Sequence, residues 1–214
     1  MLLSLHADIR RDGFALRVDL EIPSGGIIGL TGGIGSGKST VLDLIAGRVR
    51  AHAGSVCWED RVWDDPTTGV FVADRPVAIQ RQLFQADLAE DRTGVENVMD
   101  AIAVHADVSD ADGWAGTTRR VLADLGLQDH VVDRLPWTFS GAESQRVALA
   151  RVLASGAPVV LLDEPFGALD KRTRQRVTEY VADWLSRHPG VAVIASSDVE
   201  LLERIGASAV HLDG

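Results

Sequence analysis

The chain has 214 residues, of which 46% are hydrophobic and 24% charged, and its formal net charge is −10. This size and apolar content suit one α/β domain, with or without an insertion, and a sizeable buried core. The acidic excess argues against a general nucleic-acid-binding surface, which needs a basic excess, and leaves only a local basic patch open, so we expect no nucleic-acid partner. The early charges argue against a signal peptide, and no uncharged apolar run approaches the roughly 18 residues of a membrane span.

The first third of the sequence is predicted to be β structure. Residues 3–9 and 14–22 alternate between apolar and polar side chains, as half-buried strands do, and residues 11–13 between them form a turn signal. A short apolar run at residues 27–30 predicts another strand. Residues 54–72 predict further strands, separated by segments rich in Asp, Pro, Thr and Gly.

A glycine-rich segment follows the strand at residues 27–30 and precedes a helical pattern at residues 41–49. In this setting a G-x-x-x-x-G-K-[ST] match indicates a phosphate-binding loop, because glycines let backbone N–H groups turn toward phosphate oxygens. Lys38 can reach the β- and γ-phosphates and the Ser39 hydroxyl can bind Mg²⁺, so we predict a nucleoside triphosphate here. The predicted phosphate-binding residues are Gly32, Gly33, Ile34, Gly35, Ser36, Gly37, Lys38, Ser39 and Thr40.

The remaining chain changes period twice. Residues 93–127 have a helical pattern and predict an inserted helical subdomain. Short apolar runs then predict strands that alternate with amphipathic helical patterns, which indicates a parallel sheet covered on both faces. The predicted strands are residues 158–162, 191–195 and 209–212, and the predicted helices are residues 177–185 and 199–205.

Two adjacent acids, Asp163 and Glu164, follow the apolar strand at residues 158–162. At the carboxyl end of a parallel strand they are expected beside the phosphate loop. Asp163 suits a Mg²⁺ contact, and Glu164 suits orienting and deprotonating an attacking water. Alternatively, the two acids could simply be solvated residues at the end of a strand. The phosphate loop earlier in the sequence argues against this alternative.

Together these motifs resemble the nucleotide-binding ATPase subunits of ABC transporters over nearly the whole chain. Residues 32–40 are similar to the family's Walker A motif and residues 159–164 to its Walker B motif, while residues 139–146 resemble the signature segment and residues 167–170 the D-loop. The resemblance implies an α/β P-loop NTPase core with a parallel sheet, an antiparallel β subdomain and a helical subdomain. We expect a single domain over residues 1–214. Within it, residues 1–85 and 140–214 form the core with its β subdomain, and about residues 86–139 form the helical subdomain.

The signature segment is expected to form an anion site at the start of a helix predicted at residues 143–154. The Ser140 hydroxyl and bare backbone N–H groups can bind an anion there, although an ordinary N-cap is the commoner meaning of such a serine. In the family this site faces ATP held by a second subunit, so the resemblance implies a head-to-tail dimer. We expect a homodimer, and a different ATPase subunit as partner is the alternative. The resemblance also implies nucleotide contacts at Gly141, at Ala142, where the family has glycine, and at Asp170.

Three further family positions carry implied roles. A glutamine that touches the metal and senses the membrane partner is placed at Gln85, with Gln80 and Gln82 as rivals. An aromatic ring that stacks on adenine is placed at Phe14, and a core strand residue is the alternative. The family's histidine after the strand at residues 191–195 is replaced by Ser197, whose hydroxyl can donate a hydrogen bond but carries no positive charge.

The resemblance implies the ATPase motor of a membrane importer, most like those for molybdate and related oxyanions. It would bind ATP and Mg²⁺, dock on transmembrane permease subunits, and act at the cytoplasmic face of the cell membrane. The alternative is an ATP-gated module that dimerises on ATP and hydrolyses it only weakly. Ser197 and Ala142 favour this alternative, whereas Glu164 favours the ATPase. Since the sequence ends at Gly214, soon after the last predicted strand, we expect no regulatory C-terminal domain within it.

Overall fold

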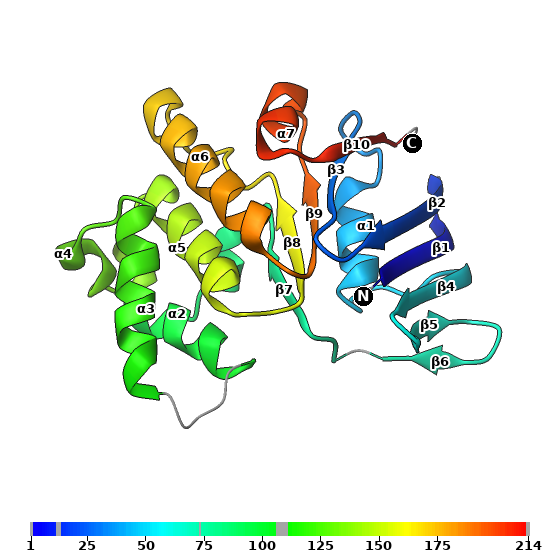
Figure 1. Cartoon of the computed structure of the whole chain (residues 1–214), viewed down its shortest axis with the longest axis horizontal. Helices are drawn as coiled ribbons and strands as arrows, with labels where there is room; N and C mark the ends of the chain where they lie inside the picture. The colour runs from blue at the N-terminus through cyan, green and yellow to red at the C-terminus, as the bar shows by residue number, and fades with distance from the viewer. Residues whose placement is uncertain (1, 12–13, 73, 106–110, 213–214) are drawn as a thin grey trace.

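The computed structural model describes residues 2–11, 14–72, 74–105 and 111–212, and it contains two five-stranded sheets (Figure 1). The first sheet is antiparallel, with strand order β2-β1-β4-β5-β6. Its strands are β1 (Leu2–Arg11), β2 (Phe14–Pro23), β4 (Ala53–Trp58), β5 (Arg61–Asp65) and β6 (Val70–Phe71). The strands predicted within residues 3–22 and 54–72 are therefore confirmed, while residues 12 and 13 of the predicted turn lie outside the described part of the chain.

The second sheet is parallel, with strand order β10-β3-β9-β8-β7. Its strands are β3 (Ile27–Thr31), β7 (Val77–Gln80), β8 (Val159–Asp163), β9 (Val191–Ala195) and β10 (Ser208–His211). The predicted parallel sheet is confirmed. It contains one further strand, β7, which was not among the predicted strands. Because β3 and β8 both flank β9, the segments that follow these strands meet at one edge of the sheet.

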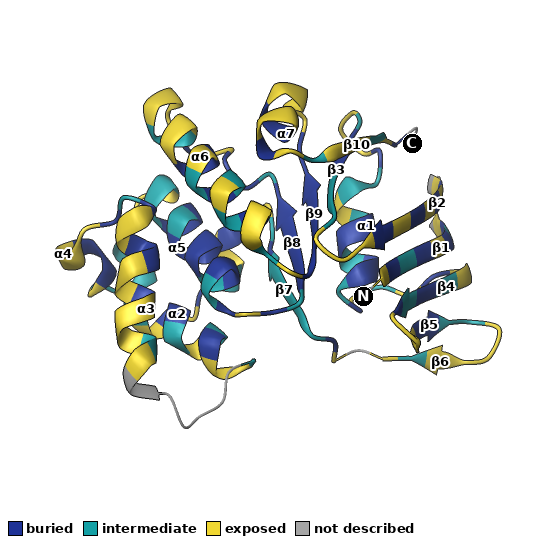
Figure 2. Cartoon of the chain, in the orientation of Figure 1, coloured by how far each residue is buried: buried dark blue, intermediate teal, exposed yellow. Residues whose placement is uncertain are grey.

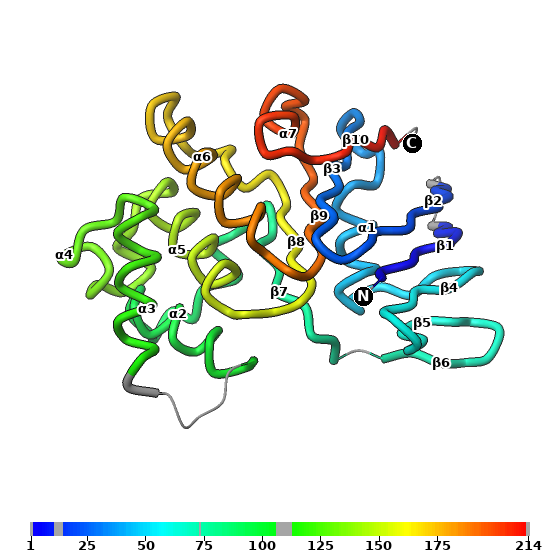
Figure 3. Tube along the Cα trace, viewed as in Figure 1, coloured from blue at the N-terminus to red at the C-terminus, as the bar shows by residue number. Residues whose placement is uncertain are grey.

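The helices of the described ranges are α1 (Lys38–Ile45), α2 (Gly94–Ala103), α3 (Ala111–Asp124), α4 (Asp129–Val132), α5 (Gly141–Ala154), α6 (Lys171–Arg187) and α7 (Val199–Ile205), with short 3₁₀ turns at Phe84–Asp87 and Pro136–Thr138. Helix α1 covers one face of this parallel sheet, α5, α6 and α7 cover the other, and α3 and α4 pack on other helices. Figure 3 shows the chain passing from the sheets into the group α2 to α5 and returning to the parallel sheet at β8, after which α6 and α7 alternate with β9 and β10. An α/β fold with an antiparallel β part and an inserted helical part is thus confirmed, while its exact division at residues 86 and 139 stays a prediction.

Two hydrophobic cores share the parallel sheet, because successive side chains of a strand point to opposite faces. Val159 and Leu161 of β8 join a core formed with α1 and the antiparallel sheet. Val160 and Leu162 join the other core, formed mainly with α2, α5, α6 and α7. β8 and β9 are buried along their full length (Figure 2), which explains why they read as continuous apolar runs.

Arg75 attaches the end of α1 to the antiparallel sheet. Its buried guanidinium donates to the carbonyls of Leu44 and Ile45 at 2.7 and 2.9 Å, and to the carbonyl of Trp63 in β5 at 3.2 Å. The last carbonyls of a helix lack intrahelical partners, so a buried cation there satisfies them and complements the helix dipole. The helix that follows the glycine-rich loop is therefore anchored at its far end.

Candidate functional site

The glycine-rich loop connects β3 to α1, as predicted. Gly35 and Gly37 have φ angles of 82° and 95°, in the left-handed region where residues with a Cβ are strained. Gly32 has a φ of 140°, and a Cβ there would lie 2.5 Å from Ser36 Oγ and 2.7 Å from the carbonyl oxygen of Leu212. This loop conformation therefore depends on glycine at these three positions.

The loop collects hydrogen-bond donors suited to an anion. Lys38 Nζ lies against the loop, where it donates to the carbonyl oxygens of Gly32 and Gly33 at 2.8 and 2.9 Å. Ser36 Oγ is buried and has no hydrogen-bond partner in the protein. No side chain caps α1, whose N-cap is Gly37, so its first backbone N–H groups are left for an anion. These features fit a bound triphosphate.

The loop forms one wall of a cleft of about 830 Å³, a size typical of small-molecule sites. Residues from four separate parts of the sequence line it. They are Gly32, Gly33, Ile34, Gly35, Ser36, Gly37, Lys38, Ser39, Thr40, Gln82, Asp163, Glu164, Gly167 and Ser197. The structure therefore brings together the whole predicted phosphate loop, both predicted acids and Ser197.

Asp163 is the last residue of β8 and is buried at the base of the cleft, with 6% of its surface exposed. Burial raises the pKa of its carboxyl above the ordinary value, a hydrogen bond with the Ser39 side chain works in the opposite direction, and the charge of Glu164 raises it further. A buried carboxylate next to a serine hydroxyl is stabilised by a cation, so this pair fits a magnesium contact.

Glu164 has an unusual backbone for a residue with a side chain, with a φ of 46°. Its carboxylate points to the loop after β9, where Oε1 accepts a hydrogen bond from the backbone N–H of Ser197 at 2.9 Å. The Ser196 hydroxyl lies 3.5 Å from Oε2. Left-handed residues that carry side chains concentrate at functional sites, where the surrounding contacts hold them in place.

Of the three candidate glutamines, Gln82 lines the cleft, whereas Gln85, the favoured position, does not. Gln85 is exposed in the 3₁₀ turn at Phe84–Asp87 and does not line the cleft. The side chain of Gln80 is buried and donates to the carbonyls of Arg81 and Asp163, at 3.0 and 3.4 Å. The 3₁₀ turn at Phe84–Asp87 separates Gln85 from the segment that carries Gln82.

The signature segment does not line the cleft of its own chain. Ser140 caps α5, which begins at Gly141 rather than at residue 143, and Ser140 Oγ accepts from the backbone N–H of Glu143 at 3.2 Å. The same hydroxyl lies 3.0 Å from Glu143 Oε2, and that carboxylate accepts from the Ser140 backbone N–H at 2.8 Å. Ser140 and Glu143 thus form a reciprocal capping box, so the N-cap that the sequence left open as an alternative is present, while the anion contact at Ser140 stays a prediction.

Asp170 also stands apart from the cleft. Asp170 caps α6 by accepting hydrogen bonds from the backbone N–H groups of Arg172 and Thr173, at 3.0 and 3.1 Å. The adenine contact expected at Phe14 concerns a side chain outside the described residues. Gly141 and Ala142 follow Ser140 on α5 and, like it, are not part of the cleft wall.

Sequence reasoning missed Gln145, a buried residue of α5 that contacts the backbone of Glu164. Its Nε2 donates to the Glu164 carbonyl at 3.0 Å, and its Oε1 accepts from the Ala168 N–H at 2.8 Å. A signal was present, since Gln145 shares one helical face with the apolar residues Leu149 and Val152, at i+4 and i+7. A polar side chain on an apolar face needs a buried partner.

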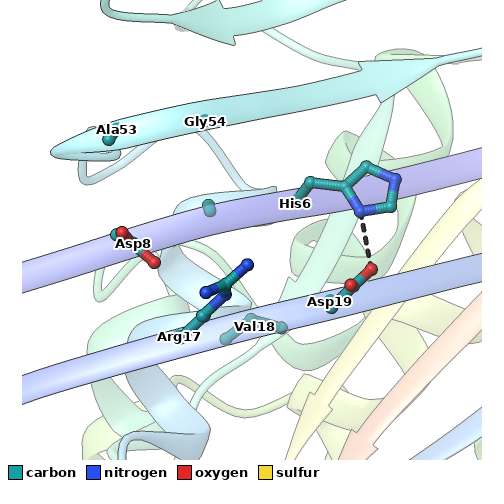
Figure 4. A pocket seen from close by; sticks show the side chains of 8 residues that line it. His6, Asp8, Arg17, Val18, Asp19, Ala53 and Gly54 are labelled. Carbon is teal, nitrogen blue, oxygen red and sulfur yellow. Dashed lines mark hydrogen bonds and ion pairs between the residues drawn. The ribbon is translucent and has the colours of Figure 1, made fainter.

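A separate hollow of about 200 Å³ lies on the outer face of the antiparallel sheet (Figure 4). His6 Nδ1 lies 2.6 Å from Asp19 Oδ1 on the neighbouring strand, and both side chains are substantially exposed. Arg17 and Asp8 stand beside them, on facing strands. This mixed, solvated group of charges fits a surface cross-strand network better than a ligand site.

Comparison with known proteins identifies relatives of the whole chain. Residues 16–167 match the ABC transporter family. The chain is 32% identical to the molybdenum import ATP-binding protein ModC of Albidiferax ferrireducens, over 99% of this chain and 56% of the relative. It is 37% identical to the thiamine import ATP-binding protein ThiQ of Chelativorans sp., over 90% of this chain and 75% of the relative. The chain thus spans about half the length of the first of these relatives.

Two solved structures share the fold. A dimeric ATP-binding cassette in a post-hydrolysis state with ADP and Pi superimposes with a TM-score of 0.81 at 23% identity, over 100% of this chain and 94% of that chain. A dimeric bacterial ABC transporter cassette gives 0.81 at 24% identity, over 99% and 94%. The family match covers most of the chain, from β2 through the glycine-rich loop and α5 to the acidic pair, and the chain therefore belongs to the ABC transporter family.

Proposed function

We propose that this chain binds and hydrolyses ATP as the motor subunit of an ABC-type importer. The observation that carries the proposal is the position of Glu164, which lines the same cleft as Lys38 and the rest of the phosphate loop. A carboxylate beside a triphosphate site can orient water for attack on the γ-phosphate. Relatives named as import ATP-binding proteins for molybdenum and thiamine support the transport role.

In this proposal the loop binds the phosphates of ATP. The backbone N–H groups of the glycine-rich loop and of the start of α1 donate to phosphate oxygens, and Lys38 Nζ turns from the Gly32 and Gly33 carbonyls to the β- and γ-phosphates. Glycine at 32, 35 and 37 keeps the backbone accessible. The predicted adenine contact at Phe14 remains part of the proposal.

Magnesium would be held by Ser39, Asp163 and Gln82 together with the phosphates. No group of three or more His, Cys, Asp or Glu side chains suited to a metal occurs in the described ranges, so the protein supplies only part of the ligand set. That fits Mg²⁺, which commonly binds through one or two protein ligands plus phosphates and waters. When bound, it neutralises charge that develops on the phosphate oxygens.

Glu164 acts as the base in the proposed reaction. It accepts a proton from a water whose oxygen attacks the γ-phosphorus, and the bond from that phosphorus to the bridging oxygen breaks to give ADP and inorganic phosphate. The Ser197 N–H fixes the orientation of the carboxylate. The Ser197 hydroxyl is the shorter replacement for the family's histidine.

The motor is proposed to work as a dimer, because one chain does not bring the signature segment to its own cleft. Ser140, Gly141, Ala142 and Asp170 would contact the nucleotide held by a second ATPase subunit, and the dimeric solved relatives support this. The Ser140 hydroxyl must then exchange its contact with Glu143 for a phosphate oxygen. We propose a homodimer as the simplest assembly.

The membrane enters only through permease subunits in this proposal. Within the described ranges, no helix is long and apolar enough to cross a bilayer. A groove of about 330 Å³ between the core and the helical part, lined by Arg48, Arg81, Val104 and Arg151 among others, is proposed as the permease contact. Arg81 also adjoins Gln82, so a partner docked there would touch the segment that reaches the cleft. The motor would act at the cytoplasmic face of the cell membrane, on molybdate or a related oxyanion.

The test is the substitution Glu164→Gln, which keeps the shape of the side chain and removes the base. The wild type should release phosphate from Mg²⁺-ATP, and the variant should retain ATP and shift from monomer to dimer in size-exclusion chromatography. The matched control is Glu179→Gln, on the exposed face of α6. A variant that hydrolyses ATP as fast as wild type would refute the assignment of Glu164.

The alternative function is an ATP-gated dimerising module with weak hydrolysis. Ser197 and Ala142 favour it, because a hydroxyl replaces an imidazole and a methyl group lies where the family has a bare backbone. Steady-state phosphate release with and without a membrane partner separates the two functions. Turnover that stays negligible in the presence of the permease would favour the regulatory module.

A further inference from the structure

Gln145 connects helix α5 to the segment that carries Glu164. The residue is 1% exposed, and both ends of its amide are used: Nε2 donates to the Glu164 carbonyl at 3.0 Å and Oε1 accepts from the Ala168 N–H at 2.8 Å. A buried amide with both ends paired has one well-defined orientation. It therefore ties α5 to two points of the chain, one on each side of Phe166.

The backbone of Glu164 needs such support. Its φ of 46° is unfavourable for a residue with a Cβ and persists only where neighbouring groups determine it. The Glu164 N–H donates to the Ala195 carbonyl at 2.9 Å, and its carbonyl accepts from the Gly167 N–H at 3.2 Å as well as from Gln145. Gln145 thus reinforces a strained turn with a side chain that belongs to another element.

The same helix begins at the signature segment. Ser140 is the N-cap of α5, and Gln145 lies five residues further on, or about 7.5 Å along the helix axis at 1.5 Å per residue. The capping box between Ser140 and Glu143 makes this first turn rigid. A displacement of the start of α5 is therefore carried directly to the amide of Gln145.

We propose that Gln145 is a positioning residue that fixes the backbone of Glu164 and Ala168 to α5, so that contact at Ser140 is transmitted to the base of the same chain. This inference rests on the proposed function, because the base acts only if the cleft hydrolyses ATP. Gln145 itself does not line the cleft. Its effect is on the position of the Glu164 carboxylate.

The experiment compares Gln145→Met, which keeps the length and removes both hydrogen bonds, with wild type. Because a displacement of about 1 Å can cost roughly 10²-fold in rate, we expect kcat for ATP hydrolysis to fall by about 10- to 100-fold. KM for Mg²⁺-ATP should stay within about twofold, since the phosphate loop is untouched. Gln145→Glu retains an acceptor for the Ala168 N–H and loses the donor to Glu164, so its kcat should also fall.

A second measurement does not depend on turnover. Amide hydrogen exchange at Ala168 should accelerate in Gln145→Met, where the acceptor is lost, and should stay slow in Gln145→Glu. The matched control is Gln175→Met on the exposed face of α6, which should change neither quantity. Thermal melting checks that all variants are folded.

The transmission is tested by combining substitutions. In a Glu164→Gln background, adding Gln145→Met should leave ATP-driven dimerisation intact, because the Ser140 contacts remain and only their connection to the base is cut. Loss of dimerisation there, or a kcat for folded Gln145→Met within twofold of wild type, would overturn the proposal. If wild type itself has no turnover, the proposed function fails, and unchanged exchange at Ala168 would still refute the role of Gln145.

Discussion

The substitution Ser197→His tests whether the serine at this position, where the family has histidine, limits the rate of ATP hydrolysis. Ser197 lines the cleft, its side chain is exposed, and its backbone N–H already holds Glu164 Oε1 at 2.9 Å. The substitution leaves that backbone bond in place and adds a ring that extends further into the cleft than the serine hydroxyl and can donate a hydrogen bond. Ser197→His should therefore change the chemistry without removing an existing contact of the base.

The magnitude follows from the value of one preorganised donor. Such a donor is worth ~10²–10³ in rate at comparable sites, and solvent exposure at position 197 places the effect near the lower end, about 10²-fold or roughly 2.7 kcal/mol of barrier. The increase should fall on kcat rather than on KM, because the contact strengthens as the charge on the phosphate develops.

The assay is steady-state phosphate release at saturating Mg²⁺-ATP for wild type and Ser197→His. Val199→His, an exposed position on α7 that does not line the cleft, is the matched control and should behave like wild type. If the wild type releases phosphate rapidly and Ser197→His releases it more slowly, serine is a working replacement for the histidine. The interpretation of a weakened site would then be wrong.

Two further predictions concern the floor of the cleft. Lys38→Ala should abolish most ATP binding in calorimetry, because an ammonium facing phosphate has no substitute nearby, and Lys171→Ala on the surface of α6 should not; retained affinity would refute the loop assignment. Asp163→Asn should raise the melting temperature of the nucleotide-free chain at neutral pH, because burial raises the pKa of this carboxyl and so penalises its charged form. The gain should vanish as the pH falls and Asp163 takes up a proton, with Asp60→Asn as the exposed control, and a gain that persists in acid would contradict this reasoning.

Sequence periodicity predicted the strands better than the ends of the helices. The strand at residues 191–195 was predicted with the bounds it has, because a strand buried on both faces is an uninterrupted apolar run. The first helix was placed at residues 41–49, whereas α1 spans Lys38–Ile45. Periodicity cannot show that Lys38 is already helical, since the phosphate motif interrupts the pattern, and Gly47, with a φ of 73°, lies just beyond the helix end.

The site was predictable where a local motif determines local geometry. The phosphate loop and the acidic pair each lie within a few residues of a strand end, so their meeting followed from the parallel sheet. Gln82 and Gln145 depend instead on tertiary contacts. Gln82 lines the cleft and Gln85 does not, because the chain turns between them. A hydrogen bond from the Arg81 N–H to Asp87 Oδ2, at 2.8 Å, holds that turn. No spacing along the chain encodes that turn.

The capping box changes how the signature segment must work. Partial burial opposes ionisation of Glu143, but hydrogen bonds from Ser140 prevail and lower the pKa of its carboxyl, so Glu143 is charged at neutral pH. A charged carboxylate beside Ser140 repels a phosphate, and Arg134, whose Nη2 lies 3.3 Å from Glu143 Oε1, offsets part of that charge. In the proposed dimer, closure on a partner's ATP would require Ser140 to release Glu143 while Arg134 retains it. In that proposal the exchange would oppose closure in addition to the crowding expected from the Ala142 methyl group, and both would act before the chemistry proposed for Glu164.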